Sequence, residues 1–158
     1  ALEILVKSGK TLAVGVSNYE PATFEALQSF LPFPLAANQM EFSVKSTDNF
    51  FNGVVDTARR LGTALMAWSP LGGGSVFKGE DEQSVRLRKT LKEIANKHQT
   101  TMDAVMYAFV FRHPADIIAI TGTMNLSRVK TAVEALSLTL TYDEWYGILA
   151  ASRGFDVP

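Results

Sequence analysis

The sequence predicts an α/β fold in which parallel strands alternate with helices. Four apolar runs are predicted to be strands, and the first of them, residues 11–17, is too short and too continuously apolar for an amphipathic helix, so it suits a strand buried on both faces. Residues with helical spacing follow each of these segments. A polar residue or a glycine also stands at the carboxyl end of each one. The four predicted strands are residues 11–17, 35–42, 63–69 and 117–121.

The first two predicted helices end or begin at residues that favour helix termini. A helix over residues 1–9 stops at Gly9, because glycine readily adopts the left-handed conformation that ends a helix. A second helix begins at Pro21, which suits the first helical turn, and stops before Pro32. Apolar residues at helical spacing face the core in both helices: Leu2, Leu5, Val6, Phe24, Leu27 and Leu31.

A third helix precedes the third strand, and a charged helix follows it. The third helix is expected to begin at Thr47 or Asp48, either of which can cap it, and to stop at Gly62. Residues 77–84 are predicted to form a polar loop before the charged helix. The expected buried residues are Phe51, Val54, Val55, Ala58 and Leu61 in the third helix, and Leu87, Leu91, Ile94 and Ala95 in the charged one.

Three further helices begin at residues that can accept hydrogen bonds from the first helical turn. The predicted caps are Thr100 with Asp103, then Asn125 or Ser127, and finally Thr141 with Glu144. Gly154 is expected to end the last helix. The predicted buried residues are Val105, Met106, Phe109 and Val110, then Val129, Ala132, Val133 and Leu136, and finally Trp145, Ile148 and Leu149.

Strands that alternate with helices pair in parallel through right-handed crossovers, which leaves two architectures. In a (β/α) barrel, the carboxyl ends of the strands build the active site on one rim. An open doubly wound sheet usually carries a G-x-G-x-x-G turn after its first strand, and this chain has none there. We therefore expect the barrel architecture. Its rim would gather Ser17, Asn18, Gln39, Ser69 and Thr123.

The composition narrows the classes of function. A hydrophobic content of 47% with 20% charged residues is typical of a packed globular chain. The formal charge of −1 gives no reason to expect nucleic acid or an anionic membrane as a partner. The absence of cysteine fits a reducing, cytoplasmic location, and the two histidines are too far apart in the sequence to suggest a metal site. No apolar run is long enough to cross a bilayer.

Four segments resemble the second half of an aldo-keto reductase in both order and spacing: SGKTLAVGVSN, NQMEFS, AWSPLGGG and ITGTMNLSRVKTAVEAL. The resemblance covers essentially the whole chain and is closest to the bacterial group with an SPLGGG loop. It implies that residues 1–158 form a single segment, the C-terminal half (strands five to eight) of a (β/α)8 TIM barrel. It also implies an oxidoreductase that reduces aldehydes or ketones with NADP(H).

The resemblance implies three groups of cofactor-binding residues. A nicotinamide carboxamide needs both hydrogen-bond donors and acceptors, and the residues in these positions are Ser17, Asn18 and Gln39. Trp68 occupies the position where the family has an aromatic ring under the nicotinamide. Backbone N–H groups would wrap the pyrophosphate at Ser69, Leu71, Gly72 and Gly73. The 2′-phosphate of NADP would lie near a helix N-terminus at Thr123, Asn125 and Arg128.

Each of these residues also has a plainer interpretation. Ser17 and Asn18 could cap the next helix, and Gln39 could satisfy buried backbone groups. Trp68 could belong to the core. The glycine run could be only a flexible turn, and Arg128 a solvated helix charge.

Two stretches depart from the pattern of the family. Thr121 and Gly122 stand where many members have proline and lysine, and Thr131 and Ala132 replace the Glu-Asn pair that contacts adenine. These departures weaken the expected grip on adenine and on part of the phosphate.

No catalytic residue is expected in this chain, because the catalytic Asp, Tyr, Lys and His of the family would all precede Ala1. His98 and His113 are predicted near helix C-termini, where a cation is mildly favoured. Tyr19 is expected to pack against the fold. The chain by itself is therefore expected to be inactive, although its parent is expected to be an enzyme. The alternative is a non-catalytic, nicotinamide-nucleotide-binding regulatory module of the same fold.

Four strands cannot close a barrel that needs about eight. The exposed edges would be Leu12–Val16 and Ile117–Ile120. Unpaired strand edges attract other strands, so we expect them to pair with the missing N-terminal half of the barrel or to cause self-association. A small-molecule carbonyl substrate is the other expected partner.

Overall fold

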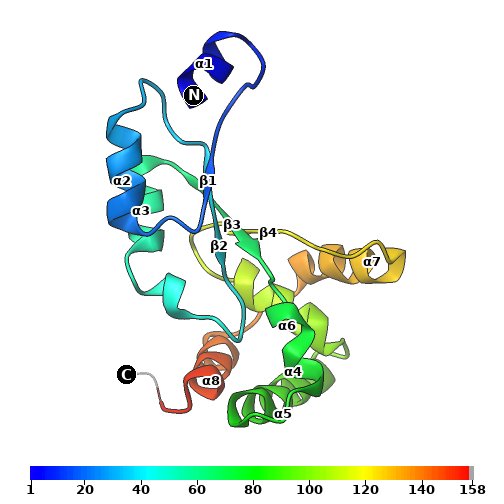
Figure 1. Ribbon diagram of the computed structural model, residues 1–158. Helices are drawn as coiled ribbons and strands as arrows, with labels where there is room; N and C mark the ends of the chain where they lie inside the picture. The colour runs from blue at the N-terminus through cyan, green and yellow to red at the C-terminus, as the bar shows by residue number, and fades with distance from the viewer. Residues whose placement is uncertain (157–158) are drawn as a thin grey trace.

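A four-stranded parallel sheet with the order β1-β2-β3-β4 organises the chain in the computed structural model, which describes residues 1–156 (Figure 1). The strands are β1 (Val16–Ser17), β2 (Ala37–Glu41), β3 (Ala64–Trp68) and β4 (Ile118–Ala119). All three neighbouring pairs are parallel, as the sequence predicts. The spatial order follows the sequence order without the reversal that defines a doubly wound sheet, which favours the barrel architecture.

The two edge strands are much shorter than predicted. Residues 11–17 were expected to be a strand buried on both faces, but only two of them are assigned to β1, and Leu12 is 99% exposed. The chain still runs beside β2, since the Ala36 N–H donates to the Val14 carbonyl at 2.8 Å. A side chain at Gly15 would place its Cβ 2.7 Å from the Ala37 carbonyl oxygen, so this close approach requires glycine. Within residues 1–156, β1 has β2 as its neighbour on one side and no strand on the other, so this segment is not buried as predicted.

Helices α1 (Leu2–Lys7), α2 (Pro21–Ser29) and α3 (Val54–Leu61) accompany the first three strands. Pro21 occupies the first turn of α2, and Gly62 ends α3 with a φ of 66°, as predicted. Neither Thr47 nor Asp48 caps α3. A short 3-10 turn, η1 (Asp48–Phe50), comes first, and the left-handed Gly53, with a φ of 91°, separates it from α3. Phe51 is therefore 51% exposed and lies outside the buried stripe.

The region after β3 contains η2 (Gly72–Gly74), α4 (Ser75–Lys78) and α5 (Glu82–Lys97). The predicted polar loop over residues 77–84 is shorter than expected. Helix α4 continues to Lys78, and α5 begins early because the Asp81 carboxylate accepts a hydrogen bond from the Ser84 N–H at 3.0 Å. The predicted stripe of α5 is confirmed, with these residues buried: Leu87, Leu91, Ile94 and Ala95.

Helix α6 (Met102–Phe111) is buried over residues 104–110 and contacts α5, α7 and β4. Its predicted capping box is wrong, because the cap is Thr101 and its side chain accepts no capping bond. Helix α8 (Tyr142–Arg153) has the predicted box, in which Thr141 and Glu144 bond each other's backbone N–H groups, and ends at Gly154 with a φ of 82°.

Helix α7 (Leu126–Glu134) and the turn η3 (Ala135–Ser137) do not bury the predicted apolar stripe. Asn125 caps α7 as predicted, accepting a hydrogen bond from the Ser127 N–H. However, Val133 is 60% exposed and Leu136 is 66% exposed. Figure 1 shows α7 extending away from the other helices. The stripe predicts burial correctly only where another element covers it.

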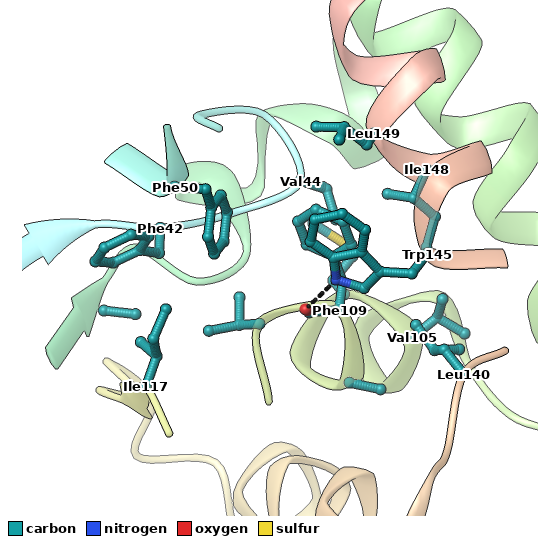
Figure 2. Close-up of a cluster of buried hydrophobic side chains, with 14 of the residues drawn as sticks. Phe42, Val44, Phe50, Val105, Phe109, Ile117, Leu140, Trp145, Ile148 and Leu149 are labelled. Atoms are coloured by element: carbon teal, nitrogen blue, oxygen red, sulfur yellow. Dashed lines mark hydrogen bonds between the residues drawn. The ribbon is translucent and has the colours of Figure 1, made fainter. Parts of the chain in front are cut away.

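Aromatic side chains from η1, α6 and α8 form the centre of the core (Figure 2). The rings of Phe109 and Trp145 stack with centroids 4.9 Å apart, and Phe50 meets Phe109 edge-on at 5.8 Å. The indole N–H of Trp145 donates to the Phe109 carbonyl at 3.0 Å. This cluster packs α6 and α8 against η1.

Candidate functional site

The end of β1 and the middle of β2 bring together three of the predicted site residues. Ser17 pairs in register with Gln39. The Ser17 Oγ donates to the Gln39 carbonyl at 3.1 Å, and the Asn18 N–H donates to the same oxygen at 2.9 Å. Parallel pairing therefore places Ser17, Asn18 and Gln39 side by side where β1 ends.

The alternative that Ser17 and Asn18 cap the next helix is wrong. The residue that caps α2 is Glu20, and its side chain makes no capping hydrogen bond. The side chains of Ser17 and Asn18 instead form hydrogen bonds with residues of β2 and β3. They are thus arranged around the rim of the sheet.

Trp68, the last residue of β3, belongs to the rim and not to the aromatic core. It is half-buried, and its indole Nε1–H donates to the Asn18 Oδ1 at 2.9 Å. Asn18 has a φ of 59°, a left-handed conformation that turns the chain sharply after β1. The polar side chain after β1 and the aromatic ring at the end of β3 therefore meet at the rim.

The segment after β3 forms a tight turn rather than an extended loop. Ser69 has a φ of 49°, and Gly72, Gly73 and Gly74 have φ values of 57°, 61° and 79°. The Gly72 N–H donates to the Ser69 carbonyl at 2.7 Å, and the Gly74 N–H to the Leu71 carbonyl at 2.9 Å. Consecutive left-handed residues are accessible to glycine at little cost, so the sequence fits this backbone.

The third predicted group surrounds the start of α7. The Asn125 N–H donates to Thr123 Oγ1 at 3.1 Å, while Asn125 Oδ1 accepts from the Ser127 N–H at 2.9 Å. Arg128 lies in the first turn of α7 and is exposed. Thr123 and Asn125 are therefore joined by a hydrogen bond, whereas among residues 1–156 no hydrogen bond joins the Arg128 side chain to either of them. The alternative of a solvated charge at Arg128 stays open.

Two polar side chains of β2 were not predicted as parts of the site. Asn38 is buried, and its amide bonds both backbone groups of Tyr19, donating to the carbonyl at 2.7 Å and accepting from the N–H at 3.4 Å. It fixes the chain directly after Asn18. Burial raises the pKa of Glu41, the register partner of Trp68. Asn38 and Glu41 are polar residues on opposite faces of a predicted buried strand, and this pattern is the sequence signal that could have indicated them.

The two histidines lie near helix ends, as predicted. His98 follows α5 as its C-cap and shares a hydrogen bond of 3.0 Å with Glu144. His113 follows α6, and burial, together with the nearby Arg59, lowers its pKa. Within residues 1–156, no group of three or more His, Cys, Asp and Glu side chains is arranged to hold a metal ion.

No helix in the described part of the chain is both long and apolar enough to span a membrane. The predicted cytoplasmic location stays a prediction.

The fold and the rim define a TIM-barrel-type α/β protein whose polar residues gather after the strands. The sequence model of the Aldo/keto reductase family matches residues 1–152, so the chain belongs to this family. It is 40% identical over 157 residues to a 6-dehydroglucose reductase of Agrobacterium fabrum, covering 99% of this chain and 52% of that protein. It is also 40% identical over 159 residues to the oxidoreductase YdhF of Escherichia coli, covering 100% and 53%.

Solved structures agree on the fold. A thermostable aldo-keto reductase, Tm1743, in complex with the inhibitor epalrestat superposes with a TM-score of 0.82 at 23% identity, over 94% of this chain and 51% of that one. The aldose reductase from Giardia lamblia superposes with a TM-score of 0.80 at 20% identity, over 99% and 50%. The chain thus spans about half the length of the curated relatives and the solved structures that it matches.

Proposed function

We propose that the protein that carries this chain is an oxidoreductase that reduces aldehydes or ketones with NADP(H), and that this chain supplies most of the cofactor site. The observation that carries the proposal is the meeting of two strand ends at the rim. The Trp68 indole at the end of β3 donates to Asn18 directly after β1, and Ser17 at the end of β1 donates to the Gln39 carbonyl of β2. The chain belongs to the Aldo/keto reductase family, and its relatives are named as reductases and oxidoreductases. Both facts support an oxidation–reduction reaction.

In this proposal, three rim side chains hold the nicotinamide carboxamide and one holds the ring. A carboxamide has an N–H₂ donor and a carbonyl acceptor, and fixing both decides which ring face is presented to a substrate. Ser17, Asn18 and Gln39 offer both kinds of group. The half-buried indole of Trp68 offers a flat apolar surface against the ring.

The turn after β3 and the start of α7 would hold the phosphates. The turn of Ser69, Leu71, Gly72 and Gly73 would offer backbone N–H groups of Ser69, Leu71 and Gly73 to a pyrophosphate. The Gly72 N–H already donates to the Ser69 carbonyl at 2.7 Å, so Gly72 would contribute only the open space of a residue without a side chain. At α7, the positive helix terminus and the exposed Arg128 favour an anion, which fits the 2′-phosphate of NADP. Thr123 and Asn125 complete this group.

We further propose that residues 1–158 are the C-terminal half of the barrel and that the other strands belong to the same protein. Three observations support this: the chain spans about half of its relatives, Ile118 on the edge strand β4 is 52% exposed, and the apolar side of α7 is uncovered. The catalytic Asp, Tyr, Lys and His would lie in that other half. A second copy of this chain at the same edges is the competing outcome.

The test is NADPH oxidation by the protein that carries this chain, with generic aldehydes as substrates. Turnover is the expected result. Binding of NADPH without turnover of any aldehyde would favour the alternative of a regulatory module. The relatives are named as reductases and oxidoreductases, and these names do not favour that alternative. Absence of both binding and turnover would contradict the proposal.

A further inference from the structure

One hydrogen bond at the rim crosses the middle strand of three. Trp68 ends β3, Asn18 follows β1, and β2 lies between these two strands. Trp68 pairs in register with Glu41, whereas the residue before Asn18 pairs with Gln39. The indole must therefore extend over the end of β2 for its Nε1–H to reach the Asn18 Oδ1 at 2.9 Å.

This bond fixes the orientation of the Asn18 amide. The backbone of Asn18 is already held, since its N–H donates to the Gln39 carbonyl at 2.9 Å. The indole is a donor only, so it selects the rotamer in which Oδ1 faces Trp68 and Nδ2 faces away. The Nδ2 group has no acceptor among residues 1–156, which leaves it free to donate to a bound molecule.

The same bond fixes the indole. A tryptophan side chain has two rotatable bonds, and a hydrogen bond at the far end of the ring restricts both. Phenylalanine could supply a similar stacking surface at this position but could not donate this bond. Trp145 makes the corresponding bond to the Phe109 carbonyl inside the core, whereas the partner of Trp68 is an exposed side chain.

We propose that Trp68 is a positioning residue that acts through Asn18. Its N–H holds the amide so that Nδ2 donates to the carbonyl oxygen of the nicotinamide carboxamide, while its ring lies against the nicotinamide. The inference rests on the proposed function, because it takes the ligand to be a nicotinamide nucleotide. One neutral hydrogen bond corresponds to about a 5-fold change in affinity.

The first test needs no cofactor. In protein labelled with ¹⁵N, Trp68→Phe identifies the indole N–H resonance of Trp68 by removing it. Asn18→Ala should shift that resonance and accelerate its exchange with solvent, whereas Asn18→Asp keeps an acceptor and should preserve its protection. An indole resonance that is unchanged in Asn18→Ala would overturn the inference.

The second test is a double-mutant cycle on the dissociation constant of NADP⁺. Trp68→Phe keeps a ring but should weaken binding about 5-fold in the native background and much less in the Asn18→Ala background. Asn18→Asp should also weaken binding, because a carboxylate cannot donate to the carboxamide oxygen. The exposed Tyr146 of α8 supplies the control, and Tyr146→Phe should change nothing.

The outcomes separate this inference from the proposed function. Independent, multiplicative effects of Trp68→Phe and Asn18→Ala would overturn the inference and leave the proposed function standing. A native protein that does not bind NADP⁺ would contradict both. Equal melting temperatures of the variants ensure that the cycle reports on binding, and a merely structural role of Trp68 would give no coupling with Asn18.

Discussion

Removing the charge of Glu144 should destabilise the protein in a pH-dependent way. Glu144 Oε1 accepts hydrogen bonds from Lys97 Nζ at 2.6 Å and His98 Nε2 at 3.0 Å, while Oε2 accepts from the Thr141 N–H at 2.9 Å. Burial alone would raise the pKa of Glu144, but the bonds from Lys97, Thr141 and His98 outweigh it and lower the pKa to about 2. The carboxylate thus ties α5 to the start of α8.

The magnitude follows from this pKa. The pKa of Glu144 falls from the ordinary 4.5 to about 2. At about 1.4 kcal/mol per pKa unit, this fall limits the contribution of the carboxylate to the free energy of unfolding to about 3 kcal/mol. Lys97 is 65% exposed, and solvent screens its interaction, so we expect about 1–2 kcal/mol. Because the folded-state pKa is depressed, this stability is complete above pH 4.5 and is lost as the pH falls through about 2.

The assay is denaturant unfolding of the protein that carries this chain, comparing Glu144→Gln with the native protein between about pH 7 and about pH 3. The difference in unfolding free energy should be about 1–2 kcal/mol at neutral pH and should shrink toward pH 3. Glu134→Gln removes an exposed pair with Lys130 at 3.8 Å and serves as the control, with an expected change below about 0.5 kcal/mol. A loss in Glu144→Gln that stays constant across this pH range would refute the reasoning.

Three further predictions concern the rim and its completeness. Arg128→Ala should weaken NADPH binding by roughly 10- to 100-fold, and equal weakening of NADH would contradict the 2′-phosphate assignment. Gly72→Ala should lower the unfolding free energy by about 1–2 kcal/mol, because its φ is 57° and the new Cβ would lie 3.2 Å from Lys45 Cβ. Gly147→Ala, within α8 and in open space, should raise the unfolding free energy by up to about 1 kcal/mol. A stabilising Gly72→Ala together with a destabilising Gly147→Ala would refute the strain argument. The 158-residue chain, confirmed by intact mass, should not oxidise NADPH with generic aldehydes; turnover at rates usual for the family would contradict the assignment of catalysis to other residues.

The sequence predicts well where the determining interactions are local. Apolar runs locate all four strands, and helical spacing identifies the buried residues of α5, because their partners lie within this chain. The box of Thr141 and Glu144 depends on residues three apart, and it forms. Gly53 was the missed local signal, since its left-handed backbone separates η1 from α3.

The predictions fail where burial depends on a neighbour. The expected strand over residues 11–17 lies at one edge of the sheet, and α7 and η3 follow the strand at the other edge. No described element covers Leu12 or Leu136. Apolar patterning reports what a surface prefers and not what covers it. The bond between Trp68 and Asn18 had no signal in the sequence either, because it depends on the distance across β2 between residues 50 positions apart.

The central claim, that this rim holds a nicotinamide against Trp68, is tested most directly by tryptophan fluorescence during a titration with NADP⁺. The account predicts quenching that Trp68→Leu largely removes and Trp145→Phe retains, because Trp145 lies in the core with only 8% of its surface exposed. A signal that survives in Trp68→Leu and disappears in Trp145→Phe would contradict the placement of the cofactor.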